Sequence, residues 1–385
     1  MTPLLLLLVT LVVAWLGLCV LLTRAACPPP EGDEVIPVPT EDGWVLQLHR
    51  FRPRGPAPPK TTPLILAHGL NMNRGCWALS PGTGLLPALQ EAGFDVYTAE
   101  YRGTSGSRPP SRRVRWSYGP EDHYRTDIPA LISKVKQISG SKEVDWVGHS
   151  MGGILLYLYA RTYGSASIRR AVTLGSPAQF GLPPLAPSRP TLKLGRFVSG
   201  RKRLLSSFFC WLTVPFVALS PRLFATTFLR ASHLSRREAI SLCTHAFEDV
   251  SGRTHGFFID LAARRAQLMP PPEAHVNGYL QGGFERFESP LLVVASTQDY
   301  LAPPKAVARA WEHATRSYRA FVCFGSTESP EGSPSFGHCD LASSTAAREH
   351  VLPLIEAWLS GGCPLAPPEA LLREPMPQDS DETAP

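Results

Sequence analysis

The segment of residues 144–160 constrains the fold of this chain more than any other. An apolar run, VDWV, leads into the sequence GHSMG at residues 148–152, and a second apolar run, ILLYLYA, follows. This order predicts a buried strand, a Gly-x-Ser-x-Gly turn and a helix. Such a turn holds its serine in a strained conformation with an exposed hydroxyl, and its glycines leave room for the neighbouring chain. Ser150 is therefore the candidate nucleophile, in preference to an ordinary serine in a strand-to-helix loop.

Length and composition exclude several classes of protein. A chain of 385 residues is long enough for one large α/β core with an insertion, or for two domains. The net charge of +6 comes without a long block of Lys and Arg, which argues against a nucleic-acid-binding protein. The eight cysteines form no Cys-x-x-Cys pair and no Cys/His ligand spacing, so we expect neither a metal site nor a cofactor. Disulfide pairing stays open.

The N-terminus carries a long apolar segment. Residues 4–22 contain no charge, and about 19 residues at about 1.5 Å each nearly span a hydrocarbon core. The absence of Lys and Arg before this run favours an uncleaved membrane anchor over residues 1–27, whereas Ala25 and Ala26 favour a cleaved signal sequence. The prolines at 28–30 would separate this helix from the folded domain.

Short apolar runs alternate with helical patterns over most of the remaining chain. The first two runs, residues 35–38 and 44–51, flank an Asp-Gly turn and predict an antiparallel hairpin. Later runs predict strands of a parallel sheet covered by helices on both faces; they are residues 63–67, 94–98, 144–147, 171–174, 291–295 and 320–324. One amphipathic helix is expected over residues 341–359, with Asp340 as its N-cap.

The alternation divides the chain into segments. Residues 28–181 and 287–362 are predicted to form the two parts of the core, and residues 363–385 a disordered tail. Residues 182–286 break the alternation and predict a mainly helical inserted cap. In this cap the basic residues 201–203 precede the apolar pair 204–205 and the apolar cluster 208–212, an order that suits a helix at a membrane surface. The alternative is a cap that roofs a pocket and leaves its basic residues in water.

A serine hydroxyl needs a base within hydrogen-bond reach, and that base needs an orienting acid. His338, before the last helix, is the candidate base, and Asp299, after the strand of residues 291–295, is the candidate acid. Loops at the carboxyl ends of parallel strands are where ligand sites of such sheets lie. The competing interpretations are an exposed turn aspartate and a histidine at a helix entrance. His149, beside the nucleophile, is expected to pack at the turn.

Attack on a carbonyl produces an oxyanion, which needs two fixed donors. The backbone N–H of Met151, at the start of the helix after Ser150, is one candidate. The N–H of Leu70, in the loop after the strand of residues 63–67, is the second.

These motifs together resemble the α/β-hydrolase superfamily, and within it the acid-lipase and serine-esterase branch. The resemblance spans residues 35–359; it rests on EDGWVL at 41–46, HGL at 68–70, GHSMG at 148–152 and GHCD at 337–340. It implies a mostly parallel central sheet flanked by helices, and a Ser150, Asp299 and His338 triad. It also implies hydrolysis of a carboxylic ester, and the apolar cap and the anchor favour a lipid-like substrate at a membrane. The alternatives are an acyltransferase that uses the same acyl-enzyme and a membrane-bound relative without catalytic activity.

Overall fold

The computed structural model describes residues 2–104, 106–181, 188–220, 233–264, 284–327 and 329–362. Its centre is an eight-stranded sheet in the order β1-β2-β4-β3-β5-β6-β9-β10. The strands are β1 (Glu34–Pro39), β2 (Val45–Phe51), β3 (Leu64–Ala67), β4 (Val96–Glu100), β5 (Val144–His149), β6 (Ile168–Leu174), β9 (Leu291–Ser296) and β10 (Arg319–Phe324). The hairpin β1-β2 is antiparallel and β2 runs antiparallel to β4, whereas the remaining neighbours are parallel. The predicted parallel sheet with an antiparallel opening hairpin is confirmed.

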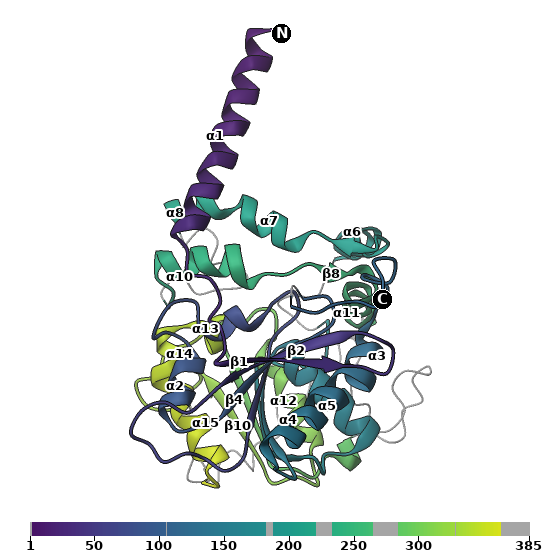
Figure 1. Cartoon of the computed structure of the whole chain (residues 1–385), viewed down its shortest axis with the longest axis vertical. Helices are drawn as coiled ribbons and strands as arrows, with labels where there is room; N and C mark the ends of the chain where they lie inside the picture. The colour runs from purple at the N-terminus through teal and green to yellow at the C-terminus, as the bar shows by residue number, and fades with distance from the viewer. Residues whose placement is uncertain are drawn as a thin grey trace, which may run out of the picture.

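Helices cover both faces of this sheet (Figure 1). One face carries α4 (Ile128–Ser139), α5 (Met151–Tyr163) and α12 (Pro304–His313), whose apolar residues share a cluster with the sheet. The other face carries α2 (Leu85–Glu91), α13 (Asp340–Ser343), α14 (Thr345–His350) and α15 (Leu352–Leu359) in a second cluster. Strands with helices on both faces are buried on both sides, which explains their continuous apolar runs.

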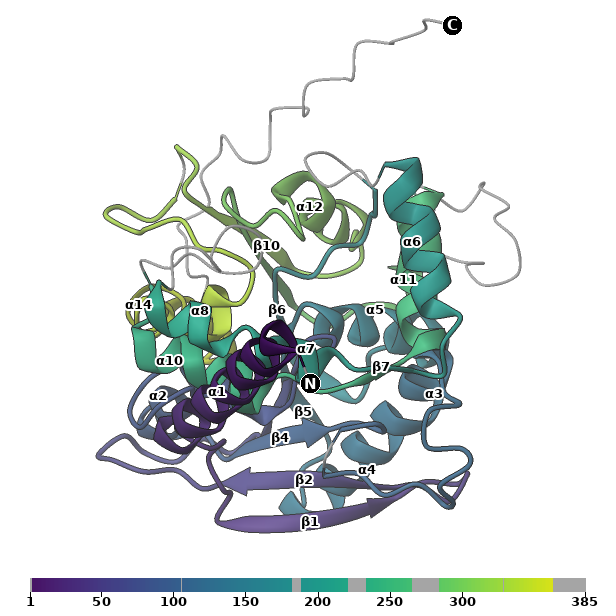
Figure 2. The ribbon, with the colours of Figure 1, turned by 90° about the horizontal axis from the view of Figure 1, so that it is seen from above.

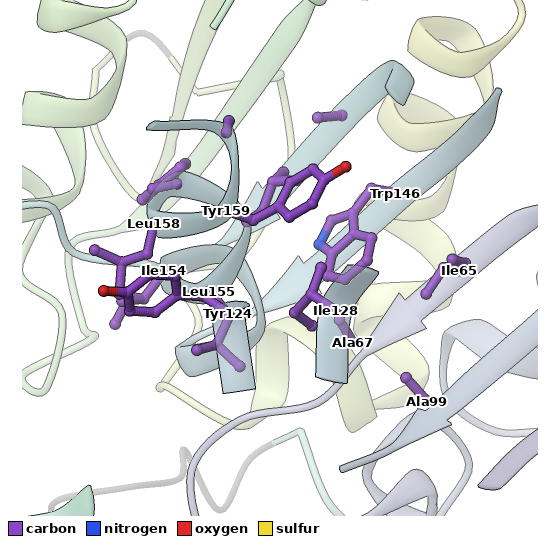
Figure 3. Packing of buried hydrophobic residues seen from close by; sticks show 14 of the residues in the cluster. Ile65, Ala67, Ala99, Tyr124, Ile128, Trp146, Ile154, Leu155, Leu158 and Tyr159 are labelled. Carbon is purple, nitrogen blue, oxygen red and sulfur yellow. The ribbon is translucent and has the colours of Figure 1, made fainter. Parts of the chain in front are cut away.

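The helix after Ser150 is anchored at the centre of the first cluster. Every residue of α5 from Met151 to Ala160 is buried. Figure 3 shows part of this packing, with Trp146 of β5 beside Ile128 of α4 and the α5 side chains close by. The indole Nε1 of Trp146 donates to the carbonyl of Gly152, 3.3 Å away, and so ties β5 to the first turn of α5. The segment that presents Ser150 is therefore held by close packing on both sides.

The last part of the chain differs from the predicted single helix. It forms the three short helices α13, α14 and α15 instead of one helix over residues 341–359. Ser344 is extended, with φ −87° and ψ 160°, and caps α14 by accepting from the N–H of Ala347. Pro353 lies in the first turn of α15, where a missing N–H costs no helical hydrogen bond. Asp340 is not an N-cap, because it is already the first helical residue of α13.

The segment between β6 and β9 is mainly helical in its described parts, residues 188–220 and 233–264, which we call the cap. It contains α6 (Arg189–Ser199), α7 (Ser206–Leu212), α8 (Val214–Leu219), α10 (Arg236–Ser241) and α11 (Gly252–Ala263). The short strands β7 (Arg203–Leu204) and β8 (Val250–Ser251) pair antiparallel and join its two halves. The helices α6, α7 and α8 form a layer that lies over the sheet (Figure 1). The predicted tail, residues 363–385, lies outside the described residues, as does Cys363, and the other seven cysteines are free thiols.

The N-terminal helix α1 (Pro3–Ala25) has the length and composition of a membrane span or a signal sequence. It rises from the cap layer and points away from the sheet (Figure 1). Its last turns are not separate from the folded domain, in contrast to the expectation from the prolines at 28–30. Cys19 is fully buried, and the N–H of Cys27 donates to Ser241 Oγ of α10 at 2.9 Å. The cap therefore supplies the surface against which the end of α1 packs.

Candidate functional site

Ser150 occupies the turn between β5 and α5 in a strained backbone conformation. Its φ of 52° and ψ of −117° lie outside the regions that L-residues favour. The turn is packed so closely that a Cβ on Gly152 would lie 2.0 Å from the carbonyl oxygen of Ala67. A Cβ on Gly148 would lie 2.6 Å from the backbone of Gly152. Both glycines of the predicted motif are thus required by contact with neighbouring backbone, and Ser150 has the conformation that the sequence predicted.

The structure brings the three predicted triad residues together. His338 Nε2 is 2.8 Å from Ser150 Oγ, and His338 Nδ1 is 2.8 Å from Asp299 Oδ2. Asp299 is fully buried, and its other oxygen accepts from the backbone N–H groups of Leu301 and Ala302. A carboxylate only accepts, so Nδ1 carries the proton and Nε2 is free to accept from the Ser150 hydroxyl. This is the arrangement that a base needs to activate a serine.

Two further residues support this arrangement: Gly175, which the sequence analysis did not assign, and His149, for which it expected only packing. Gly175 follows β6 with φ of 55°, and a Cβ there would lie 2.9 Å from Asp299 Oδ2. His149 Nε2 lies 2.8 Å from the backbone carbonyl of His338 and donates to it, because a carbonyl only accepts. A glycine directly after a buried strand was the available signal for Gly175. The contact of His149 depends on a residue 189 positions away, and local sequence carries no signal for it.

His149 is neutral in the folded protein. It is 1% exposed, and its ring centre lies 4.8 Å from that of His338. Burial, together with the nearby His338, lowers the pKa of His149 to about 3. A neutral ring with its proton on Nε2 can donate to His338 without adding a charge beside the candidate base. The expected packing role of His149 therefore comes with a specific hydrogen bond.

The two predicted oxyanion donors lie at the same cavity. Leu70 and Met151 both line it, next to Ser150. Within the described part of the chain, neither backbone N–H donates a hydrogen bond to the protein. Free N–H groups beside a nucleophile are what a developing oxyanion requires.

The cap holds the loop that contains Leu70. The N–H of Glu248 donates to the carbonyl of Asn71 at 2.7 Å, and Met72 forms an isolated β-bridge with Phe247. Asn73 is 3% exposed; its Nδ2 donates to the carbonyl of His245 at 2.8 Å and to a carboxylate oxygen of Glu248 at 2.9 Å. The position of the loop thus depends on the cap, a link between distant segments that the sequence did not reveal.

A cavity of about 810 Å³ lies above Ser150. Its floor contains Ser150 and His338, and most of its walls are apolar side chains from the core and the cap. The apolar wall residues are Leu70, Met72, Met151, Ile154, Pro177, Phe180, Val198, Leu204, Leu205, Phe209, Phe247, Phe258 and Leu301. Such a cavity is large enough for the acyl part of an ester. Within the described ranges, no group of His, Cys, Asp and Glu side chains has the arrangement of a metal site.

The basic residues of the cap have different environments. Arg203 donates to Asp249 at 2.5 Å, and its guanidinium lies 5.0 Å from the ring centre of Trp116. Arg201 is exposed, lines the cavity and lies over the ring of Phe197 at 5.2 Å. Lys202 is also exposed. Arg203 is exposed as well, so all three predicted surface cations lie at the surface, but in the described structure only Arg203 is paired with a carboxylate of the cap.

Known proteins share both the sequence and the fold of this region. Human lipase member M is 34% identical over 125 residues, which cover 30% of this chain and 29% of that protein. Triacylglycerol lipase 2 of Arabidopsis thaliana is 29% identical over 155 residues, or 37% of each protein. The chain thus spans about a third of the length of these relatives. They confirm the resemblance to lipases that the sequence motifs indicated.

Solved structures show the same fold over a larger part of the chain. An esterase of Thermogutta terrifontis has a TM-score of 0.52 at 18% identity and covers 85% of this chain and 98% of its own. A bromoperoxidase of Bacillus anthracis has a TM-score of 0.54 at 17% identity and covers 85% and 100%. The alpha/beta hydrolase fold family matches residues 62–326, a region that includes Ser150 and Asp299 and exceeds half of the chain. On this evidence the protein belongs to the alpha/beta hydrolase fold family.

Proposed function

We propose that the protein is a serine hydrolase that cleaves carboxylic esters with an apolar acyl group. The observation that carries this proposal is the chain of contacts from Ser150 through His338 to the buried Asp299, at the floor of an apolar cavity. The lipase and esterase names of its relatives support the same reaction class. The family alone does not decide the reaction, since one fold hosts many activities.

The geometry supports a two-step reaction. Ser150 Oγ attacks the ester carbonyl while His338 Nε2 takes its proton, and the N–H groups of Leu70 and Met151 stabilise the oxyanion. The tetrahedral intermediate collapses to the acyl-enzyme, and the leaving alcohol takes the proton from His338. Water then attacks the acyl group with His338 again as base, which releases the acid and restores Ser150. Asp299 keeps the proton of His338 on Nδ1 throughout.

Hydrolysis and acyl transfer differ only in the molecule that attacks the acyl-enzyme. Acyl transfer would require an alcohol or amine to replace water in the second step, with the same acyl-enzyme. Product analysis separates the two, because a transferase yields a new ester or amide when an acceptor alcohol or amine is supplied. We infer hydrolysis because the relatives are lipases.

We further infer that α1 remains attached and anchors the protein in a membrane. Its residues are apolar over the length of a bilayer span, and its end is buried against the cap. Cleavage after the alanines at 25 and 26 would remove the helix from a surface that it covers. Mass spectrometry of the membrane fraction tests this inference, because an anchored chain retains its N-terminal residues.

An organophosphonate probe and a series of p-nitrophenyl esters test the reaction. The wild-type protein should be labelled on Ser150 and should prefer longer acyl chains, because the cavity is apolar. Ser150→Ala should lose both labelling and hydrolysis. Labelling that persists in Ser150→Ala would place the nucleophile elsewhere, and hydrolysis without any chain-length preference would contradict the acyl site.

A further inference from the structure

In the described part of the chain, the exposed leucine and phenylalanine side chains outside α1 come from one part of the cap. Among the described residues outside α1, every exposed leucine and phenylalanine belongs to the segment from α6 to α8. These residues are Leu194, Phe197, Leu205, Phe208, Phe209, Phe216 and Leu219, and we call them the cap face. A patch of this kind in a folded protein marks an interaction surface.

The cap face is continuous with the membrane helix. Trp15 Nε1 of α1 donates to the carbonyl of Leu212 at 3.1 Å, and the Trp15 ring lies 4.6 Å from that of Phe216. Nearer the end of α1, Trp211 Nε1 donates to Thr23 Oγ1 at 2.9 Å. Figures 1 and 2 show that α1 rises from the cap next to α7 and α8. The cap therefore runs alongside the second half of the helix and does not merely touch its end.

The length of α1 determines how far along this helix a surrounding bilayer must extend. Residues 3–14 are exposed and stand clear of the cap, but about 12 residues at about 1.5 Å each give only about 18 Å. A hydrocarbon core needs about 30 Å, or about 20 residues. If α1 spans the membrane, the hydrocarbon must continue past Trp15 to the level of Thr23. Phe216, which contacts Trp15, then lies within the bilayer boundary.

The cavity above Ser150 reaches the same face. Its floor is Ser150 and His338, whereas its outer walls include Leu205 and Phe209, which belong to the cap face. Arg201 also lines the cavity and is exposed. Guanidinium groups bind phosphate well, so a cation at this point suits a lipid headgroup beside an acyl chain in the cavity.

We propose that the cap face lies in the bilayer that holds α1, so that the site takes its ester directly from that membrane. The occupant of the face is lipid, because α1 contacts the cap beside this face and two of its exposed residues, Leu205 and Phe209, also line the cavity. The choice of substrate rests on the proposed hydrolase function, whereas the membrane contact does not. A second copy of the chain on this face is the competing outcome that the experiment must detect.

Photo-crosslinking in the full-length protein tests the membrane contact. Benzoylphenylalanine replaces Phe208 or Phe216 in the cap face. The control position is Tyr318, which is exposed just before β10, at the end of the strands away from the site. In vesicles of phosphatidylcholine and phosphatidylglycerol, illumination should attach phospholipid at 208 and 216 but not at 318. Absence of lipid adducts at 208 and 216, or crosslinks to a second copy of the chain, would overturn the proposal.

Charged substitutions test the supply of substrate. Phe208→Glu and Leu219→Glu alter the cap face without changing a residue that lines the cavity, and Val35→Glu on the edge strand β1 is the matched control. Both cap variants should hydrolyse a long-chain ester in vesicles at least tenfold more slowly than the control, with equal turnover of a soluble short-chain ester. Unchanged vesicle turnover would refute the proposal. If no variant cleaves the soluble ester, the hydrolase function fails, and the lipid adducts still decide the membrane contact.

Discussion

Replacement of His149 by Phe should slow catalysis without weakening substrate binding. Phe fills the space of the imidazole but cannot donate to the carbonyl of His338, which His149 Nε2 contacts at 2.8 Å. A buried acceptor that loses its partner costs about 1–3 kcal/mol. The lost hydrogen bond should let His338 move away from its position beside Ser150. If the whole cost raises the activation free energy, kcat should fall by about tenfold to about a hundredfold. KM for a short ester should stay within about twofold, because the lost bond is to His338 and not to substrate.

The comparison with His149→Gln tests this reasoning. The amide Nε2 of Gln can take the place of the imidazole donor, so this variant should recover most of the lost kcat. The assay is turnover of a p-nitrophenyl ester across pH 5 to 9. Because the pKa of His149 is about 3, His149 does not titrate in this range, so the shape of the pH profile should be the same in both variants. Equal losses in the Phe and Gln variants, or a KM effect alone, would refute a positioning role.

Stability gives a second measurement on the same variant. The folded protein keeps His149 unprotonated down to a pKa of about 3, whereas the unfolded chain takes up a proton near the ordinary value of 6.5. The stability that this difference contributes is present above pH 6.5 and is lost as the pH falls toward 3. At pH 5 the loss is about 2 kcal/mol. In His149→Phe the fall in melting temperature between pH 7.5 and 5 should therefore be smaller than in the wild type.

The other expectations concern the remaining parts of the site. His338→Ala should reduce turnover by several powers of ten, about as much as loss of the nucleophile, since triad members act as a unit, and Asp299→Asn should cost less; steady-state kinetics measure both. Gly152→Ala should prevent folding, because its methyl group would collide with the backbone of β3, and circular dichroism should show native structure for the control Gly17→Ala, where no neighbour lies within 4 Å. Asn73→Ala should lower the melting temperature by several degrees and reduce kcat, since it frees the loop of Leu70 from the cap. Asn73→Asp keeps the size but replaces a donor with an acceptor, so it should behave like Asn73→Ala; normal kcat in both would show that this link does not position the loop.

The parts of the fold that follow from local sequence were predictable. Strands buried on both faces need continuous apolar runs, and the glycines around Ser150 belong to a local Gly-x-Ser-x-Gly pattern, although the contact that requires Gly152 comes from Ala67 of β3. Asp299 and His338 were predictable for a different reason. Asp299 lies in the loop after β9 and His338 lies just before α13. The chain order of Ser150, Asp299 and His338 is also the one that α/β-hydrolases use. The break in the last helix was missed because an amphipathic pattern continues across Ser344 even though that residue caps a new helix. Periodicity reports which face is buried but not where the axis changes direction.

The cap was predictable as a mainly helical insertion, but the role of each apolar residue in it was not, because these residues serve three purposes that look the same in sequence. Leu204 lines the cavity, Val217 packs under α1, and Leu219 faces outward, although all three are aliphatic residues within one short segment. The partner of each is decided by where α1 and the core place their own surfaces. The role of an apolar residue in the cap must therefore be assigned from its contacts and its exposure, and on that basis the exposed residues of the cap face are the ones that we propose to lie in a membrane.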